Sequence, residues 1–65
     1  MKLQVNGEML ELQGKTAADL IQQLHYQNTR VALEVNEHII PRSEYADFAL
    51  TENDRIEIIK AVGGG

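Results

Sequence analysis

The fold of this chain is decided by residues 2–12, which read KLQVNGEMLEL. Polar and apolar side chains alternate on both sides of the dipeptide Asn6-Gly7. A two-residue hairpin turn requires positive φ angles, which Asn and Gly tolerate. The stretch therefore predicts two antiparallel strands joined by a tight turn. Their shared apolar face consists of Leu3, Val5, Leu10 and Leu12.

A helix is predicted to begin soon after this hairpin. Thr16 can cap a free amide of the first helical turn, and Asp19 lies where its charge meets the positive helix end. The helix is expected to end near Gln27 or Asn28, because Asn can adopt the left-handed conformation that stops a helix. Its apolar stripe, at helical spacing, consists of Ala17, Leu20, Ile21 and Leu24.

The middle of the chain adds two predicted strands. Residues 31–36 are rich in β-forming side chains, and residues 36–38 are interpreted as a turn. The next strand is short and stops at Pro41, because proline cannot donate a hydrogen bond to a sheet ladder. Residues 42–47 are expected to form a loop or a single short turn. The side chains expected to return to the core after it are Phe48 and Leu50.

The last strand is predicted over residues 55–62, after a turn-rich stretch. Its apolar side chains divide between two faces, with Ile56, Ile58 and Val62 on one and Ile59 and Ala61 on the other. The element order is thus ββαβ, an irregular stretch and β, with one helix to cover one face of a mixed sheet. This is the order of the α+β, ubiquitin-like β-grasp fold. We expect residues 1–62 to form this domain and residues 63–65 to form a flexible tail.

Length and composition exclude several classes of protein. With 65 residues the chain can build a single core only. It has no cysteine, which excludes thiolate nucleophiles, disulfides and cysteine-ligated iron–sulfur clusters. A net charge of -4 disfavours nucleic acid as a partner, and no apolar run approaches the roughly 20 residues of a membrane span. We expect a cytoplasmic protein whose acidic surface steers it to basic faces of other proteins.

The chain ends in Val62 and three glycines. Gly63 and Gly64 lack a Cβ, so this segment has the narrow cross-section needed to thread the channel of a partner enzyme. The carboxylate of Gly65 can attack the α-phosphorus of ATP, but it must be activated before sulfur can attack it. The sequence has no phosphate-binding glycine loop, metal cluster or base–nucleophile pair for that step. We therefore expect a carrier with no bound cofactor, for which a partner consumes ATP, and not an enzyme.

Over essentially its whole length the chain resembles the small sulfur carrier proteins of thiamine thiazole biosynthesis. The residues that carry the resemblance are Asn36, Ile40-Pro41-Arg42, Tyr45, the stretch 54–59 and the closing 61–65. The family often has glycine where this chain has Asn53, but Asn tolerates the same left-handed turn.

The resemblance implies a reaction sequence and a set of partners. An E1-like, ATP-dependent adenylyltransferase would convert Gly65 to a glycyl adenylate. Sulfur from a donor of the cysteine desulfurase type would then give a C-terminal thiocarboxylate, 1-thioglycine. That thiocarboxylate would donate its sulfur at thiazole synthase.

Three other functions stay open. Ubiquitin-like protein modifiers and the small subunit of molybdopterin synthase also end in Gly-Gly, so the chain could be conjugated to lysines or could carry sulfur for molybdopterin. A plain interaction module with an irrelevant tail is the third alternative. Recovery of conjugates, the identity of the co-purifying synthase and the effect of removing Gly64 and Gly65 separate these alternatives from a thiamine carrier.

The surface near the tail also has two interpretations. Ile59, Ala61 and Val62 form a partner surface, or a twist or bulge of the strand carries Ile59 into the core. The basic residues either steer a partner or keep the surface soluble; they are Arg42, Arg55 and Lys60. His25 and His38 have no metal-ligand spacing, and we assign them surface or capping roles.

Overall fold

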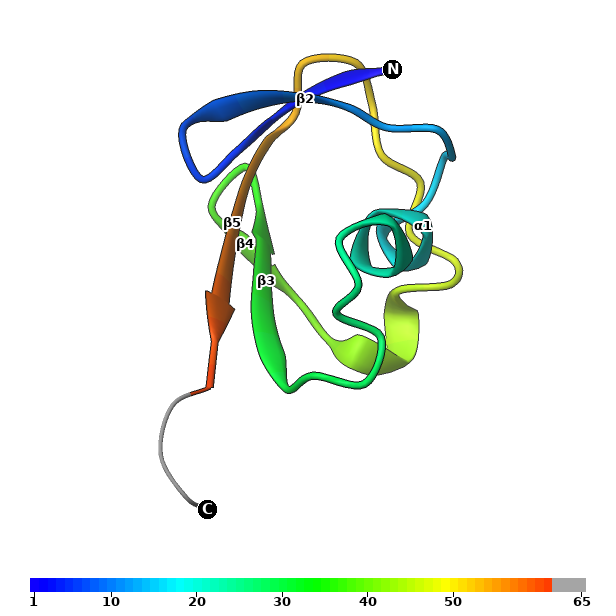
Figure 1. Cartoon of the computed structure of the whole chain (residues 1–65), viewed down its shortest axis with the longest axis vertical. Helices are drawn as coiled ribbons and strands as arrows, with labels where there is room; N and C mark the ends of the chain where they lie inside the picture. The colour runs from blue at the N-terminus through cyan, green and yellow to red at the C-terminus, as the bar shows by residue number, and fades with distance from the viewer. Residues whose placement is uncertain (62–65) are drawn as a thin grey trace.

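The structure, a computed structural model, describes residues 1–61 (Figure 1). Its five strands form one mixed sheet in the order β2-β1-β5-β3-β4. Helix α1 (Ala17–Gln23) covers one face of the sheet, and a short 3-10 helix, η1 (Arg42–Glu44), follows β4. The strands are β1 (Lys2–Val5), β2 (Glu8–Glu11), β3 (Val31–Val35), β4 (His38–Ile40) and β5 (Arg55–Lys60). The predicted β-grasp fold is confirmed.

The sheet contains two antiparallel hairpins, and a tight turn joins the two strands of each. Asn6 (φ 50°) and Gly7 (φ 84°) join β1 to β2, as the sequence predicts. Asn36 (φ 51°) and Glu37 (φ 72°) join β3 to β4 in the same way. The prediction that His38 belongs to the second turn is wrong, because two residues with positive φ already reverse the chain.

The predicted capping of α1 is confirmed in detail. The hydroxyl of Thr16 accepts a hydrogen bond from the Asp19 amide at 3.2 Å, and the Asp19 carboxylate accepts one from the Thr16 amide at 3.0 Å. The amides of Lys15 and Thr16, in that order of effect, hold the pKa of Asp19 below its ordinary value. Gly14 is required beside this cap, since a Cβ there would overlap the Asp19 side chain.

The end of α1 differs from the prediction. The helix stops at Gln23, and the residue in the left-handed conformation is His25 (φ 64°) instead of Asn28. The His25 amide donates to the Gln22 carbonyl at 3.0 Å, and the Tyr26 amide donates to the Ile21 carbonyl at 2.8 Å. These two bonds form a Schellman motif, which satisfies carbonyls that the helix leaves free. Of the two roles assigned to His25, surface or capping, the structure shows capping: its backbone is the left-handed residue of this motif.

We expect the substitution His25→Gly to stabilise the domain by about 0.5–1 kcal/mol. A left-handed conformation costs a non-glycine residue about 1–2 kcal/mol, of which the greater freedom of glycine in the unfolded chain offsets part. Urea unfolding of both proteins measures the difference. The matched control is His38→Gly, which places glycine in β4 and should destabilise. A loss of stability in His25→Gly would contradict the assignment.

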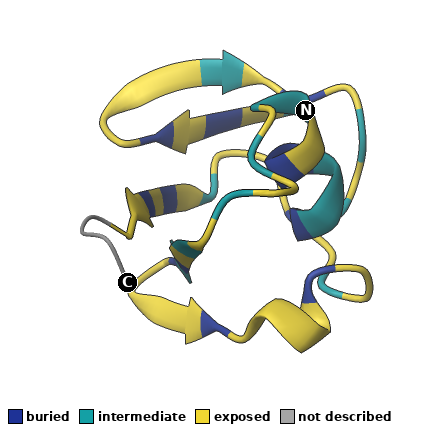
Figure 2. Cartoon of the chain, turned by 60° about the horizontal axis from the view of Figure 1, so that its bottom comes forward, coloured by how far each residue is buried: buried dark blue, intermediate teal, exposed yellow. Residues whose placement is uncertain are grey.

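The core lies between α1 and the sheet. Buried and exposed residues alternate along β1 and β5, so that Ile56 and Ile58 point inward (Figure 2). Leu50 is buried and Phe48 is partly buried, as predicted, and Asn53 adopts the expected left-handed conformation (φ 70°). Among the described residues the core has thirteen members, and one of them is Tyr45, which belongs to the stretch predicted as a loop or short turn.

Candidate functional site

The residues predicted to react or to thread a partner lie outside the described part of the chain. They are Gly63, Gly64 and Gly65, and Val62 of the predicted partner surface lies outside the described part as well. The structure does describe the strand that leads to them. Ala61, the last described residue, is exposed and lies immediately after β5. The predicted strand over residues 55–62 thus ends at Lys60 in the sheet.

Two asparagine side chains hold β5 in place. Strand β1 pairs with β5 only at Arg55 and Ile56. Farther along, the Asn6 side chain replaces it: its Oδ1 accepts from the Ile58 amide at 2.8 Å, and its Nδ2 donates to the Ile58 carbonyl at 3.1 Å. At the start of β5, Asn36 Oδ1 accepts from the Arg55 amide at 3.0 Å, and its Nδ2 donates to the Asp54 carboxylate at 3.0 Å.

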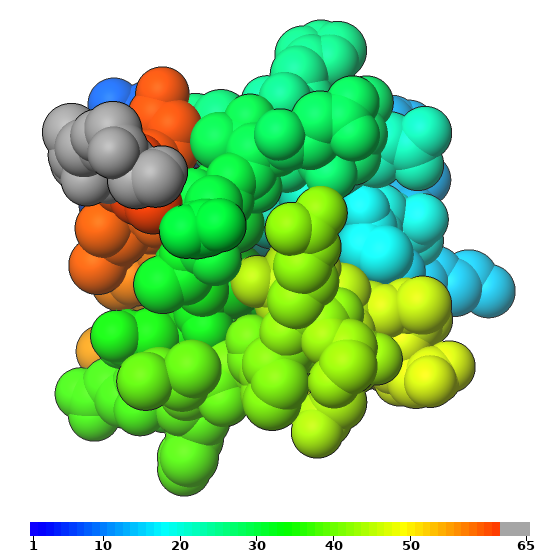
Figure 3. Space-filling view, turned by 90° about the horizontal axis from the view of Figure 1, so that it is seen from below, coloured from blue at the N-terminus to red at the C-terminus, as the bar shows by residue number. Residues whose placement is uncertain are grey.

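The far end of β5 is fixed by the segment that follows α1. The Ala61 amide donates to the Arg30 carbonyl at 2.9 Å. The Lys60 ammonium lies 5.5 Å from the centre of the Tyr26 ring, within range of a cation–π interaction. Figure 3 shows residues 26–31, in green, between the end of β5, in orange, and the yellow-green segment around η1. The last described residue is therefore held on a defined side of the domain.

Ile59 lies on the face of the sheet opposite α1. Its side chain is 58% exposed, and its cross-strand neighbour on β3 is the small Ala32. The alternative that a twist carries Ile59 into the core is wrong, because regular antiparallel pairing of β5 with β3 continues from Ile56 to Lys60. Ala61 is exposed as well. We call this uncovered side of the sheet the open face; its members include Gln4, Met9, Ala32, Glu34, Ile39, Arg55, Glu57 and Ile59.

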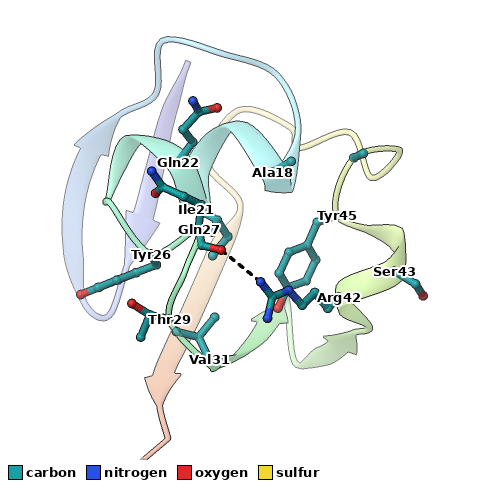
Figure 4. A pocket seen from close by; sticks show the side chains of 11 residues that line it. Ala18, Ile21, Gln22, Tyr26, Gln27, Thr29, Val31, Arg42, Ser43 and Tyr45 are labelled. Atoms are coloured by element: carbon teal, nitrogen blue, oxygen red, sulfur yellow. Dashed lines mark hydrogen bonds between the residues drawn. The ribbon is translucent and has the colours of Figure 1, made fainter.

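Of the three basic residues singled out in the sequence, two make contacts within the domain. Lys60 lies over Tyr26, and Arg42 donates through Nη2 to the Gln27 carbonyl at 3.0 Å (Figure 4). Arg42 thus ties η1 to the loop after α1, a structural role that neither sequence interpretation included. Arg55 lies on the open face.

The Arg42 bridge spans a hollow of about 300 Å³ between α1, the following loop and η1 (Figure 4). Ile21, Val31 and Tyr45 give it an apolar floor, and burial raises the pKa of the Tyr45 hydroxyl. Sequence reasoning missed this hollow because it is formed by three segments that lie apart in the chain.

Two kinds of feature are absent from the described residues. Between residues 1 and 61, no three His, Cys, Asp or Glu side chains are grouped so that they could hold a metal ion. Within the same range, no helix has the length and apolar character that crossing a bilayer requires. The distinctive feature of the described site is a strand, β5, that is held by hydrogen bonds at both ends and lies in an open sheet face.

Comparison with known proteins agrees with this geometry. The model of the ThiS family matches residues 3–65. The chain belongs to the ThiS family. It is 35% identical to the sulfur carrier protein ThiS of Bacillus subtilis over 65 residues, which covers 97% of this chain and 98% of that protein. The ThiS of Escherichia coli is 31% identical over 52 residues, covering 80% and 79% of the two chains.

A solved ThiS structure has the same fold. The crystal structure of the thiamine biosynthesis protein ThiS from Geobacter metallireducens superposes with a TM-score of 0.81 at 25% identity, and each chain is covered fully. ThiS-like sequence also occurs within a larger protein. The thiazole synthase of Paramagnetospirillum magneticum is 38% identical over 66 residues, and this chain spans 20% of its length.

Proposed function

We propose that this ThiS family member carries sulfur for the thiazole of thiamine, as a C-terminal thiocarboxylate on Gly65. The observation that carries the proposal is the 35% sequence identity to the sulfur carrier protein ThiS of Bacillus subtilis, which extends over nearly the full length of both chains. The geometry supports it, because β5 is held at both ends and Ala61, two residues before Gly63, is exposed. In this role the chain is a substrate and sulfur donor, and partner enzymes perform the catalysis in the cytoplasm.

The proposed chemistry has two steps. In the first, a carboxylate oxygen of Gly65 attacks the α-phosphorus of ATP and pyrophosphate leaves, which gives a glycyl adenylate. In the second, sulfide attacks the acyl carbon, the C–O bond to phosphate breaks, and AMP leaves. If the donor is a persulfide, the product is an acyl disulfide, and a thiol must reduce its S–S bond. Gly63 and Gly64 allow this approach because they have no side chain to collide with the walls of a channel.

The proposal assigns three kinds of partner. An E1-like adenylyltransferase binds and consumes ATP, so this chain needs no cofactor of its own. A donor of the cysteine desulfurase type supplies the sulfur. Thiazole synthase accepts it, an assignment supported by thiazole synthases that contain a segment similar to this chain.

Incubation with ATP, the adenylyltransferase of the same genome and sulfide is expected to replace one oxygen of Gly65 by sulfur. Intact mass spectrometry detects the exchange, and fragmentation localises it. The control omits ATP and should leave the mass unchanged. An unmodified terminus under conditions that thiolate Bacillus subtilis ThiS would contradict the proposal. Branched peptides that join Gly65 to lysines, without free thiocarboxylate, would favour a protein modifier instead.

A further inference from the structure

The turn between β1 and β2 contains the one Asn-Gly sequence of the chain, Asn6-Gly7. Both residues have positive φ, 50° and 84°, and Asn6 is exposed. A Cβ built on Gly7 would meet no atom within 4 Å, so the space around its backbone is open. Asparagine is a labile residue, and glycine after it favours loss of the side-chain amide, because no side chain hinders the approach of the following backbone nitrogen.

The turn between β3 and β4 provides an internal comparison. Asn36 has nearly the same φ as Asn6, 51°, and its side chain also bonds to β5, through the Arg55 amide at 3.0 Å. It is followed by Glu37, which has a side chain at the position where Gly7 has none. The two turns thus match in conformation and differ in the residue that controls attack on the asparagine.

The carboxamide of Asn6 has a structural role that a carboxylate cannot fulfil. Its Oδ1 accepts from the Ile58 amide at 2.8 Å, and its Nδ2 donates to the Ile58 carbonyl at 3.1 Å. A carboxylate has acceptors only, so an aspartate at this position would place an oxygen against the Ile58 carbonyl oxygen. The two bonds direct the side chain to β5, whereas Gly7 leads to β2, on the opposite side of β1. They therefore restrain the carboxamide from turning toward the Gly7 nitrogen.

We propose that Asn6 is a site of deamidation, that its bonds to Ile58 slow the reaction, and that the completed reaction releases β5 from this side chain. The backbone nitrogen of Gly7 attacks Cγ of Asn6 and gives up its proton. A C–N bond forms, the bond from Cγ to Nδ2 breaks, and ammonia leaves with that proton. Water then hydrolyses the succinimide at either carbonyl, which yields aspartate or isoaspartate. The modification needs no enzyme, oxidant or cofactor, and it is independent of sulfur transfer.

Both products would weaken the hold on β5. Aspartate retains an acceptor for the Ile58 amide but loses the donor to the Ile58 carbonyl. Isoaspartate routes the backbone through the side-chain carbon and adds a methylene group to the turn, which no longer fits two strands joined by two residues. The C-terminal residues follow β5, so the modification affects the strand on which the proposed carrier function depends.

Peptide mapping by mass spectrometry tests the site, with the full chain incubated at mildly alkaline pH. Asn6 is expected to convert to a mixture of aspartate and isoaspartate, while Asn36, the matched control, stays largely unconverted. In guanidinium chloride, where the chain is unfolded and the bonds to Ile58 are absent, Asn6 should convert about tenfold faster. Equal conversion of the two asparagines would overturn the assignment of the site. Equal rates in the native and the unfolded chain would overturn the protective role of the bonds.

The variant Asn6→Asp reproduces one product directly. Its urea midpoint should be lower than that of the parent protein, and its Ile58 amide should exchange about threefold faster or more. The matched control is Asn28→Asp, which makes the same change of charge in the exposed loop after α1 and should keep the parent midpoint. If Asn6→Asp does not fold, the deamidated fraction of aged protein, separated by ion exchange, provides the same measurement. An unchanged midpoint and unchanged exchange at Ile58 in the deamidated protein would overturn the release of β5.

Discussion

Removal of Gly64 and Gly65 is expected to abolish thiocarboxylate formation and to leave the domain folded. The new terminal carboxylate would lie up to about 7 Å short of the position that Gly65 reaches, and nucleophilic attack on ATP requires contact between the reacting atoms. The core formed by the described residues runs from Leu3 to Ile58, so the truncation removes none of these side chains. Intact mass spectrometry measures the product, and circular dichroism measures the fold.

A binding measurement makes this truncation more informative. If the open face provides the docking contacts, the truncated chain should still bind the adenylyltransferase and should compete with the intact protein. Replacement of Gly64 by alanine is a smaller change than the truncation. It retains the terminal carboxylate and adds one methyl group in the segment proposed to enter the channel. Thiolation of the truncated chain at an undiminished rate would show that Gly65 is not the reacting residue.

The substitution Asn6→Ala is expected to lower the free energy of unfolding by about 2–3 kcal/mol, because it leaves the Ile58 amide and carbonyl without their partner and places alanine at positive φ. A domain of 65 residues has a total stability of about 3–10 kcal/mol, so the loss is a large fraction of it. Urea unfolding measures the change. Hydrogen exchange should also show faster exchange of the Ile58 amide than of the Leu33 amide in the neighbouring strand.

Two control variants separate the hydrogen bonds from the backbone conformation. Asn6→Gly tolerates positive φ but lacks the side-chain bonds, so it should retain most of the loss. Asn53→Ala places alanine at a similar φ of 70° in a position where no side-chain hydrogen bond is present within the described residues, so it should cost less than Asn6→Ala. Equal losses for Asn53→Ala and Asn6→Ala would assign the effect to backbone strain alone.

The sequence predicted correctly the features that depend on interactions between residues close together in the chain. The Asn6-Gly7 turn and the Thr16 cap each depend on residues within a few positions of one another, and both predictions are confirmed. The helix end was missed because Asn28 has the better intrinsic preference, whereas His25 is selected by the Schellman bonds that Tyr26 completes. Tertiary context overrode propensity at that position.

Features that join distant segments were beyond sequence reasoning. The alternation of side chains put Ile59 opposite the core face but left open a twist that carries it inward. The register of β3 against β5 excludes that twist, and it alone shows that Glu34 meets Glu57. The bond from Asn6 to Ile58 links residues 52 positions apart, and no local pattern marks it. Val62 and the predicted tail, residues 63–65, lie outside the described part of the chain, and their roles stay predictions.

The parallel pairing of β1 with β5 also has a mechanical consequence. The first and last strands lie side by side, so tension between the two chain ends acts along both strands and loads their connections in shear. The amides of Gln4 and Asn6, which donate to Asp54 and Ile56, and the Asn6 side chain would share such a force and would have to break together. Hydrogen bonds that are peeled apart break one after another at much lower force. Tension applied between the two ends of the chain therefore meets a high resistance to unfolding.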